Sequence, residues 1–133
     1  MQSSNTLFSP QLFIKSGVTD IQFYSKGLGA VELRRFNNDD GSVHVAEFSI
    51  NGAIFQLHEE NHEKHEFEPT KNNGVTCLIG LFVENVDSVI NNALNAGATL
   101  INPAHDYDYG YRQAQIKDPF GHIWMIEKII GLT

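Results

Sequence analysis

The chain has 133 residues, of which 41% are hydrophobic, so length and composition predict a single domain, residues 1–133, with a hydrophobic core. The 16 acidic residues outnumber the 9 basic ones, the net charge is −7, and no predicted element carries a stripe of Lys or Arg. Nucleic acid and anionic membranes are therefore excluded as expected partners. No apolar run approaches the roughly 20 residues that cross a bilayer, and the first residues lack a signal-peptide pattern, so we expect a cytoplasmic protein.

The first half of the chain predicts a strand, a helix and further strands. Residues 10–15 form the first expected strand, and Thr19 is then the expected N-cap of a helix whose apolar residues recur at three- and four-residue spacing up to Leu28. Gly27 and Gly29 provide the left-handed exit from this helix. Two or three strands follow, over residues 31–36, 44–50 and 53–58, and the Asn-Gly pair between the last two predicts a hairpin turn.

The second half predicts the same order of elements. A strand over residues 77–83 leads to a helix capped by Asp87 and closed by Gly97. Cys77, the only cysteine, lies in an apolar run and is expected to be a buried strand thiol. Residues 59–74, between the halves, are charged and polar without periodicity and predict a surface loop. The remaining expected strands cover residues 99–101, 113–117 and 122–127.

The two halves are copies of one pattern. Three matches carry this repeat: residues 12–14 with 81–83 and 52–57 with 121–126 at an offset of 69, and 29–30 with 97–98 at an offset of 68. We therefore predict two β-α-β-β-β units, roughly residues 8–60 and 75–130, joined by the charged loop. Pairing two such copies creates a shared concave surface that can hold a ligand.

Several short motifs accompany the repeat. They are Phe23-Tyr24 followed by Gly27-Leu28-Gly29-Ala30, the strand after Asn51-Gly52, Tyr109-Gly110-Tyr111-Arg112, and Asp118-Pro119-Phe120-Gly121-His122-Ile123-Trp124. In this order they resemble the vicinal oxygen chelate superfamily of glyoxalase I, extradiol dioxygenases, fosfomycin-resistance proteins and bleomycin-binding proteins, and the last two motifs look most like its PhnB-like branch. The resemblance implies an α+β fold in which eight strands form a cup open on one side, and it implies a homodimer.

Enzymes of this superfamily hold a divalent metal through the first and last strands of each unit, usually with His, Gln or Glu. The resemblance places Ser9, Gln56, Leu78 and Met125 at those positions. Only Gln56 is a suitable donor for a hard divalent ion, because Leu78 and Met125 would line the cup with apolar surface. We therefore expect no metal and no other cofactor, and a cup that binds a small organic molecule by contact and a few hydrogen bonds, as the bleomycin-binding members do.

Three acidic or imidazole side chains leave an enzymatic alternative open. His58 and Glu127 are repeat equivalents at an offset of 69, on the same strand face as Gln56 and Met125. They are either a displaced metal site or acid–base pair, or strand-end residues near solvent. Glu47 points at the ligand if its two neighbours pack beneath the helices, and is otherwise an exposed carboxylate on an edge strand.

An aromatic and cationic cluster precedes the predicted strand at 113–117. It comprises Tyr107, Tyr109, Tyr111 and Arg112. Phenol rings can cover a ligand while the guanidinium pairs with a carboxylate or phosphate, so this segment is a candidate lid or pocket rim. The other interpretation is a surface loop whose tyrosines pack on the sheet.

These observations predict a homodimeric, metal-free protein that binds a small molecule and leave its ligand unnamed. The alternative is a metal-dependent lyase, isomerase or dioxygenase whose displaced site uses Gln56, His58 and Glu127 with Glu47. A third possibility is a structural or partner-binding dimer with an unused cup.

Overall fold

The computed structural model describes residues 6–131 of the protein. In chain order its elements are β1 Gln11–Ile14, α1 Phe23–Leu28, β2 Val31–Asn37, β3 Val43–Ile50, β4 Ala53–Glu59, the 3-10 turns η1 His62–Lys64 and η2 Pro69–Lys71, β5 Ile79–Phe82, α2 Val86–Asn95, β6 Thr99–Asp106, β7 Tyr111–Lys117 and β8 Ile123–Ile129. No helix in this range is long and apolar enough to span a membrane.

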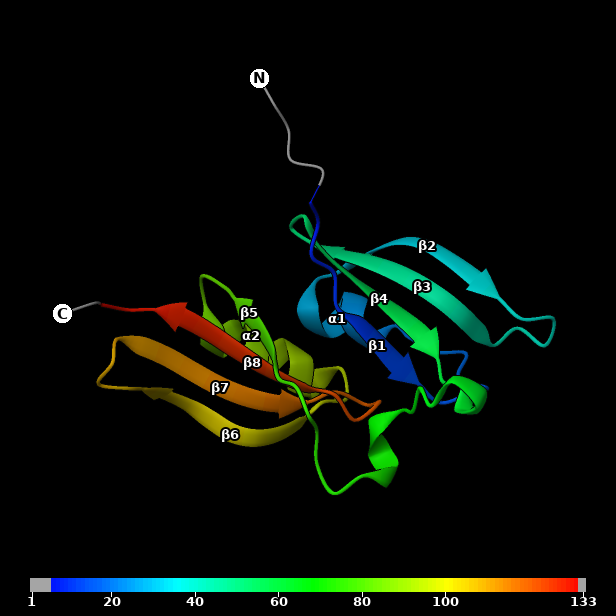
Figure 1. Ribbon diagram of the computed structural model, residues 1–133. Coiled ribbons are helices and arrows are strands. Elements are labelled where there is room, and N and C mark those ends of the chain that lie inside the picture. Colours follow the sequence, from blue (N-terminus) through cyan, green and yellow to red (C-terminus); the bar gives the residue numbers. More distant parts are fainter. Residues whose placement is uncertain (1–5, 132–133) are drawn as a thin grey trace.

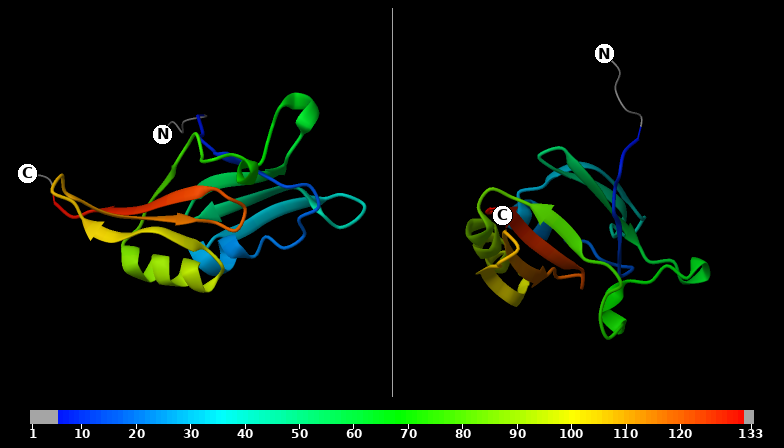
Figure 2. Two further views of the ribbon diagram at one scale, coloured as in Figure 1. Left: turned by 90° about the horizontal axis from the view of Figure 1, so that it is seen from below. Right: turned by 60° about the vertical axis from the view of Figure 1, so that its left-hand side comes forward.

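The strands form two mixed sheets of four strands each. The first sheet has the order β1-β4-β3-β2 and the second has the order β5-β8-β7-β6. In each sheet the edge pair, β1 with β4 or β5 with β8, is parallel, and the other pairs are antiparallel. The sheets lie side by side (Figure 1), and both helices lie on one side of them (Figure 2, left). The predicted α+β class with two four-stranded units is therefore confirmed.

The hydrogen-bonding register repeats as the sequence does. Gln11 pairs with Gln56 in the first sheet, and Gly80 pairs with Met125 in the second. Both residues of the second pair lie 69 positions after their counterparts in the first pair. The third strands of the units, β3 and β7, correspond at an offset of 68. The one-residue difference seen in the sequence between positions 30 and 98 therefore extends through β3 and β7 and ends at the turn before the last strand of each unit.

Helix α1 starts later than the sequence predicted. Its N-cap residue is Gln22, which makes no side-chain capping bond. The prediction of Thr19 as the cap is wrong, because the Asp20 carboxylate instead accepts the Gln22 N–H at 2.9 Å and forms a local turn ahead of the helix. The predicted left-handed exit is confirmed at Gly29, with φ 69°.

Gly27 lies inside α1 and sets how closely the two helices approach. A Cβ at this position would lie 3.1 Å from Ala96 Cβ and 3.2 Å from Ala93 Cα. Both distances are shorter than ordinary carbon contacts, so a larger side chain at Gly27 would push α1 away from α2. This glycine therefore serves close helix packing, whereas the sequence had suggested a role in the helix exit.

Helix α2 is capped by Asn85, whose side chain accepts the Ser88 N–H at 3.0 Å. The prediction of Asp87 as the cap is wrong, because Asn85 already holds the extended backbone that a cap requires. Asp87 lies in the first helical turn, where its carboxylate pairs with Arg112 at 2.8 Å.

A buried carboxylate, Asp118, joins the two units. It is 3% exposed, and its Oδ2 accepts the Tyr24 hydroxyl at 2.6 Å and the Trp124 indole N–H at 3.0 Å. Its Oδ1 accepts the backbone N–H groups of Phe120 and His122 at 2.9 and 3.0 Å. Burial, and then the adjacent Asp118 carboxylate, raise the pKa of Tyr24 well above its ordinary value.

Aromatic rings surround this carboxylate and form the centre of the core. Phe55 and Trp124, which are repeat equivalents, lie with ring centroids 5.4 Å apart and are both buried, as the sequence predicted. A second tie between the units is the His122 Nε2–H, which donates to the Phe13 carbonyl at 2.7 Å. The two units therefore share one core and are not merely tethered by the loop between them.

Candidate ligand-binding site

Each sheet has one face toward the helices and one face without helices, which we call its open face. Side chains alternate along a strand, so residues between buried positions reach the open face. On the first sheet the open face carries Val45, Glu47, Gln56 and His58. On the second sheet it carries Tyr111, Gln113, Gln115, Met125 and Glu127.

The open face of the first sheet has a charged and amide-bearing centre. Ala46 and Phe48 are fully buried under the helices, which places Glu47 on the open face. There the Glu47 carboxylate accepts the Gln56 Nε2–H at 3.2 Å and pairs with the Arg34 guanidinium at 3.5 Å. The Glu47 charge is thus matched by a cation of the same chain.

His58 lies at the end of the same face. Its Nδ1 donates to the Glu59 carbonyl at 2.6 Å, which leaves Nε2 as the nitrogen that can accept a hydrogen bond. Its ring contacts His44 and Phe13 at centroid distances of 5.0 and 6.1 Å. His58 and its repeat equivalent Glu127 belong to different sheets, and no interaction joins them among residues 6–131.

Glu127 is a largely buried acidic side chain on the open face of the second sheet. It is 8% exposed, and its Oε1 accepts the Gln113 Nε2–H at 2.7 Å. The Gln113 Oε1 in turn accepts the Tyr109 hydroxyl. Gln113 therefore holds one fixed amide orientation and connects Glu127 to the hairpin between β6 and β7.

Tyrosine rings form a continuous aromatic surface at this hairpin. Tyr107 and Tyr109 are stacked with centroids 5.3 Å apart and an interplanar angle of 15°. Tyr111 follows at 5.6 Å from Tyr109, and Phe82 of β5 contacts Tyr111 at 6.0 Å. The structure thus brings Tyr109, Tyr111 and Glu127 together, as a ligand-binding surface requires.

Arg112 is separated from these tyrosines by the strand itself. It follows Tyr111 in β7, so its side chain leaves from the helix side, where it pairs with Asp87 and Asp106, each at 2.8 Å. These hydrogen bonds raise the pKa of Arg112 above its ordinary value and lower the pKa of Asp87. The guanidinium is committed to two aspartates and does not share a surface with Tyr109 or Tyr111.

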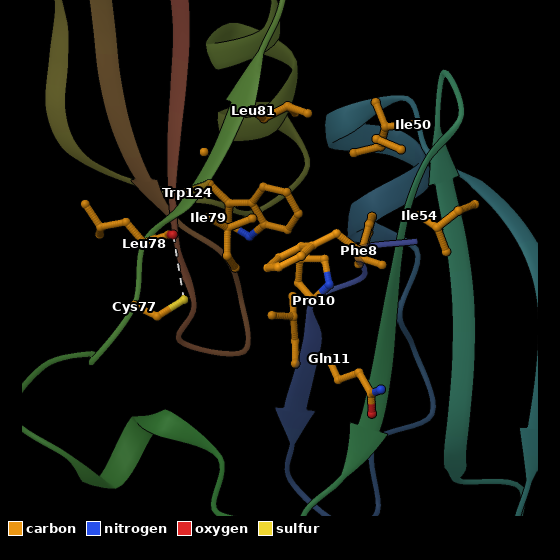
Figure 3. A pocket seen from close by; sticks show the side chains of 14 residues that line it. Phe8, Pro10, Gln11, Ile50, Ile54, Cys77, Leu78, Ile79, Leu81 and Trp124 are labelled. Atoms are coloured by element: carbon orange, nitrogen blue, oxygen red, sulfur yellow. Dashed lines mark hydrogen bonds between the residues drawn. The ribbon is translucent and has the colours of Figure 1, made fainter. Parts of the chain in front are cut away.

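An apolar groove of about 610 Å³ lies between the sheets. Its lining residues come from β1, β4, β5 and the segments before them: Phe8, Pro10, Gln11, Leu12, Ile50, Ala53, Ile54, Phe55, Cys77, Leu78, Ile79, Gly80, Leu81 and Trp124. Trp124 and Ile79 face Phe8 and Pro10 across it (Figure 3). The volume lies within the range of about 300–1,000 Å³ that is usual for small-molecule sites.

Cys77 lines this groove, and the prediction of a buried strand thiol is wrong. The residue is exposed and lies two positions before β5, which starts at Ile79. Its thiol contacts the Leu78 carbonyl at 3.7 Å. The apolar run that suggested a strand begins before β5 does. Its first residues are apolar because they line the groove.

The donors at the four positions implied for a metal do not fit a divalent ion. Leu78 and Met125 offer no oxygen or nitrogen from their side chains, and Gln56 donates its amide to Glu47. The Ser9 hydroxyl is buried without a hydrogen-bond partner, but it is a neutral, weak ligand. Across residues 6–131, His, Cys, Asp and Glu form no group of three or more suited to a metal.

Sequence reasoning missed two residues of the second open face, Gln113 and Gly80. A Cβ on Gly80 would lie 2.9 Å from the Glu127 Oε2, so the absence of a side chain makes room for that carboxylate. The repeat carried a usable signal, because the equivalent position 69 residues earlier is Gln11. Gln113 lies directly opposite Glu127 in the register, which the strand predicted to begin at 113 could have indicated.

Residues 13–126 match the Glyoxalase/Bleomycin resistance protein/Dioxygenase superfamily, and the chain belongs to this superfamily. A sequence relative is "Uncharacterized protein Mb0911c" of Mycobacterium bovis, which is 36% identical over 121 residues, or 89% of this chain and 80% of that protein. The same identity relates the chain to "Uncharacterized protein MT0910" of Mycobacterium tuberculosis, over 71% of that protein.

Solved structures share the fold at lower identity. A glyoxalase/bleomycin resistance protein/dioxygenase family enzyme from Burkholderia phytofirmans is similar with a TM-score of 0.70 and 21% identity, covering 91% of this chain and 96% of that one. TioX from Micromonospora is similar with a TM-score of 0.67 and 20% identity, covering 94% and 99%. These likenesses confirm the predicted glyoxalase-type cup fold.

Proposed function

We propose that this protein binds a small organic molecule in the groove between its sheets and on the adjoining open face of the second sheet, without a metal ion. One observation carries the proposal: an apolar groove of about 610 Å³ meets a small set of fixed polar groups at Gly80. Gly80 lines the groove and lies beneath the Glu127 carboxylate. Apolar walls with few oriented polar groups are the usual composition of small-molecule sites.

The chemistry of the donor positions supports the metal-free part of this proposal. Leu78 lies in the groove lining, and Met125 lies beside Gln113 in a small pocket of the second open face. Both side chains contribute contact area where metal-dependent members of the superfamily have ligands. The homodimer and the PhnB-like character implied by the resemblance stay predictions, and sedimentation analysis would check the former.

A thermal-shift screen tests the proposal. The full chain is screened with a library of small organic molecules, each with and without a chelator. We expect at least one compound to raise the unfolding temperature equally under both conditions, since a ligand at a hundredfold over its Kd stabilises by about 2.7 kcal/mol. A compound that stabilises only with added Zn²⁺, Mn²⁺ or Fe²⁺ would favour the metal-dependent enzyme and contradict the proposal.

A matched pair of variants locates the bound compound. Leu78→Lys places a positive charge in the groove lining, at a residue that is 48% exposed and so tolerates substitution. Leu100→Lys makes the same change on β6 at a residue that is 42% exposed and outside the groove. Stabilisation should be lost in the first variant and kept in the second, and equal behaviour of the two would place the ligand elsewhere.

A further inference from the structure

The Glu127 carboxylate is enclosed and has no cation. Its side chain belongs to a residue that is 8% exposed, and no ion pair reaches it among residues 6–131. Oε1 accepts one neutral hydrogen bond from Gln113, whereas Oε2 lies over Gly80 and receives no hydrogen bond from any described residue. Oε2 still reaches solvent, so a ligand can contact it, and a carboxylate with this little exposure is stabilised by a nearby cation.

The aromatic surface beside this carboxylate has the second property of a cation site. The Tyr107, Tyr109 and Tyr111 rings are contiguous, and Tyr109 is 54% exposed. The face of a tyrosine ring carries negative electrostatic potential and attracts alkylated ammonium and guanidinium groups within about 6 Å. The tyrosine rings and the carboxylate therefore both attract a cation, and they lie on the same side of the sheet.

The hydrogen bonds between them fix both parts. Tyr109 donates to Gln113, and Gln113 donates to Glu127. Partial burial, followed by the neighbouring Tyr107 and Glu127, raises the pKa of Tyr109 above its ordinary value. The phenol therefore remains a neutral donor at physiological pH, and it adds no second negative charge that would need its own partner.

We propose that the ligand of this protein is an organic cation whose alkylated ammonium group lies against Tyr109 and Tyr111 and pairs with Glu127. This inference rests on the proposed function and narrows its ligand class. The excess of acidic residues, with a net charge of −7, also favours the approach of cations. Arg112, the cation that would have favoured a carboxylate or phosphate ligand, lies on the other side of β7 and is already paired twice.

The first sheet supplies an internal control. Glu47, like Glu127, accepts an amide N–H from a glutamine on the neighbouring strand, here Gln56. It differs in having the Arg34 guanidinium at 3.5 Å, and no tyrosine of residues 6–131 borders it on the open face. The Glu47 charge is therefore already paired with a cation of the chain, and a ligand cation should not bind there.

The test uses choline and its neutral isostere 3,3-dimethylbutan-1-ol, titrated into the full chain and followed by amide chemical shifts in NMR. We expect choline to shift the resonances around Tyr109 and Glu127 with a Kd about tenfold lower than that of the alcohol, which corresponds to about 1.4 kcal/mol. Glu127→Gln and Tyr109→Leu should each weaken choline binding roughly tenfold. Glu47→Gln should leave it unchanged, and thermal unfolding of each variant confirms that it is folded.

The possible failures are distinguishable. Equal binding of choline and the alcohol, or equal loss in Glu127→Gln and Glu47→Gln, would overturn the cation inference and leave small-molecule binding intact. The same holds if choline does not bind while neutral compounds from the thermal-shift screen do. If no compound of any charge binds or stabilises the protein, the proposed function fails together with this inference.

Discussion

The two halves of the molecule agree on their buried faces and differ on their open faces. Phe55 and Trp124 occupy equivalent buried positions, as do Leu57 and Ile126, and the strands that carry them pair in the same register. On the open side, the position equivalent to His58 holds Glu127. The shared register fixes where side chains stand, and the open-face residues decide what they can bind.

Local charge balance shows this difference most clearly. In the first half the Glu47 carboxylate has both Gln56 and Arg34 as partners, so its negative charge is balanced by a positive one. In the second half the Glu127 carboxylate has only the neutral Gln113 as a partner, and tyrosine rings instead of a cation lie on the same face. One half of the fold therefore satisfies its own charge, whereas the other leaves a charge available to a ligand.

The largest expected effect comes from breaking what the halves share. Trp124→Ala and Phe55→Ala each remove a buried ring from the common aromatic core, in which their centroids lie 5.4 Å apart. Each should lower the free energy of unfolding by about 3–5 kcal/mol. Chemical denaturation measures both, and a loss below about 1 kcal/mol in either variant would show that the two halves do not depend on one core.

A smaller loss is expected from Tyr24→Phe, which removes the hydroxyl that ties the first half to Asp118 of the second. The buried carboxylate loses a donor, so the free energy of unfolding should fall by about 1–3 kcal/mol. Ser49→Ala is the control, because it also removes a hydroxyl at the end of a strand, but this hydroxyl only accepts the Gly52 N–H at an exposed turn. Denaturation curves that ranked Ser49→Ala above Tyr24→Phe would contradict this account.

The same tyrosine predicts a dependence on alkaline pH. Its pKa is raised in the folded state, so above the unfolded value of about 10 the unfolded chain releases a proton that the folded chain keeps. The contribution of Tyr24 to stability should therefore be constant below about pH 10 and fall above it by up to about 1.4 kcal/mol per pH unit. Tyr24→Phe should lose this contribution, and an unchanged alkaline slope in the variant would argue against it.

Gly80→Ala should sharpen the contrast between the open faces with little effect on the fold. The new Cβ would lie 2.9 Å from Glu127 Oε2, the movable end of a side chain, so the carboxylate should shift away from its place over β5. We expect choline binding to weaken several-fold, with a stability loss below about 1 kcal/mol. Val45→Ala, on the open face of the first half and outside the groove lining, should not change binding, and titration by NMR compares the two.

Much of this arrangement could be predicted from sequence because it depends on alternation along strands. The repeat and the period of two placed Gln56 and Glu127 on the strand faces where the structure has them, whereas the orientation of Glu47 depended on the burial of its neighbours Ala46 and Phe48. The sequence was a weaker guide to which of several neighbouring polar side chains makes a given hydrogen bond. Both predicted helix caps failed because a neighbouring residue, Asp20 or Asn85, supplies the hydrogen bond instead.

The boundaries of strands explain the remaining differences at the site. The strand predicted over residues 113–117 begins at Tyr111, and this earlier start puts Tyr111 and Arg112 on opposite faces by alternation alone. Loop residues have no defined side-chain direction, so the sequence alone could not separate Tyr111 from Arg112. The later start of β5, at Ile79, likewise leaves Cys77 and Leu78 outside the sheet.

The smallest expected effect separates the two faces of β7. Arg112→Gln removes the partner of Asp87 and Asp106 on the helix side, so the pKa of Asp87 should rise toward its ordinary value because its main cause of lowering is the Arg112 hydrogen bond. Asp87 is exposed and Arg112 is half-buried, and ion pairs near the surface contribute little to stability, so the unfolding temperature should hardly change. Choline affinity should stay at the wild-type value, whereas Tyr111→Leu, one residue earlier on the open face, should reduce it. NMR titration of the Asp87 carboxyl and of choline binding measures both effects, and a loss of binding in Arg112→Gln equal to that in Tyr111→Leu would mean that the two faces are not independent.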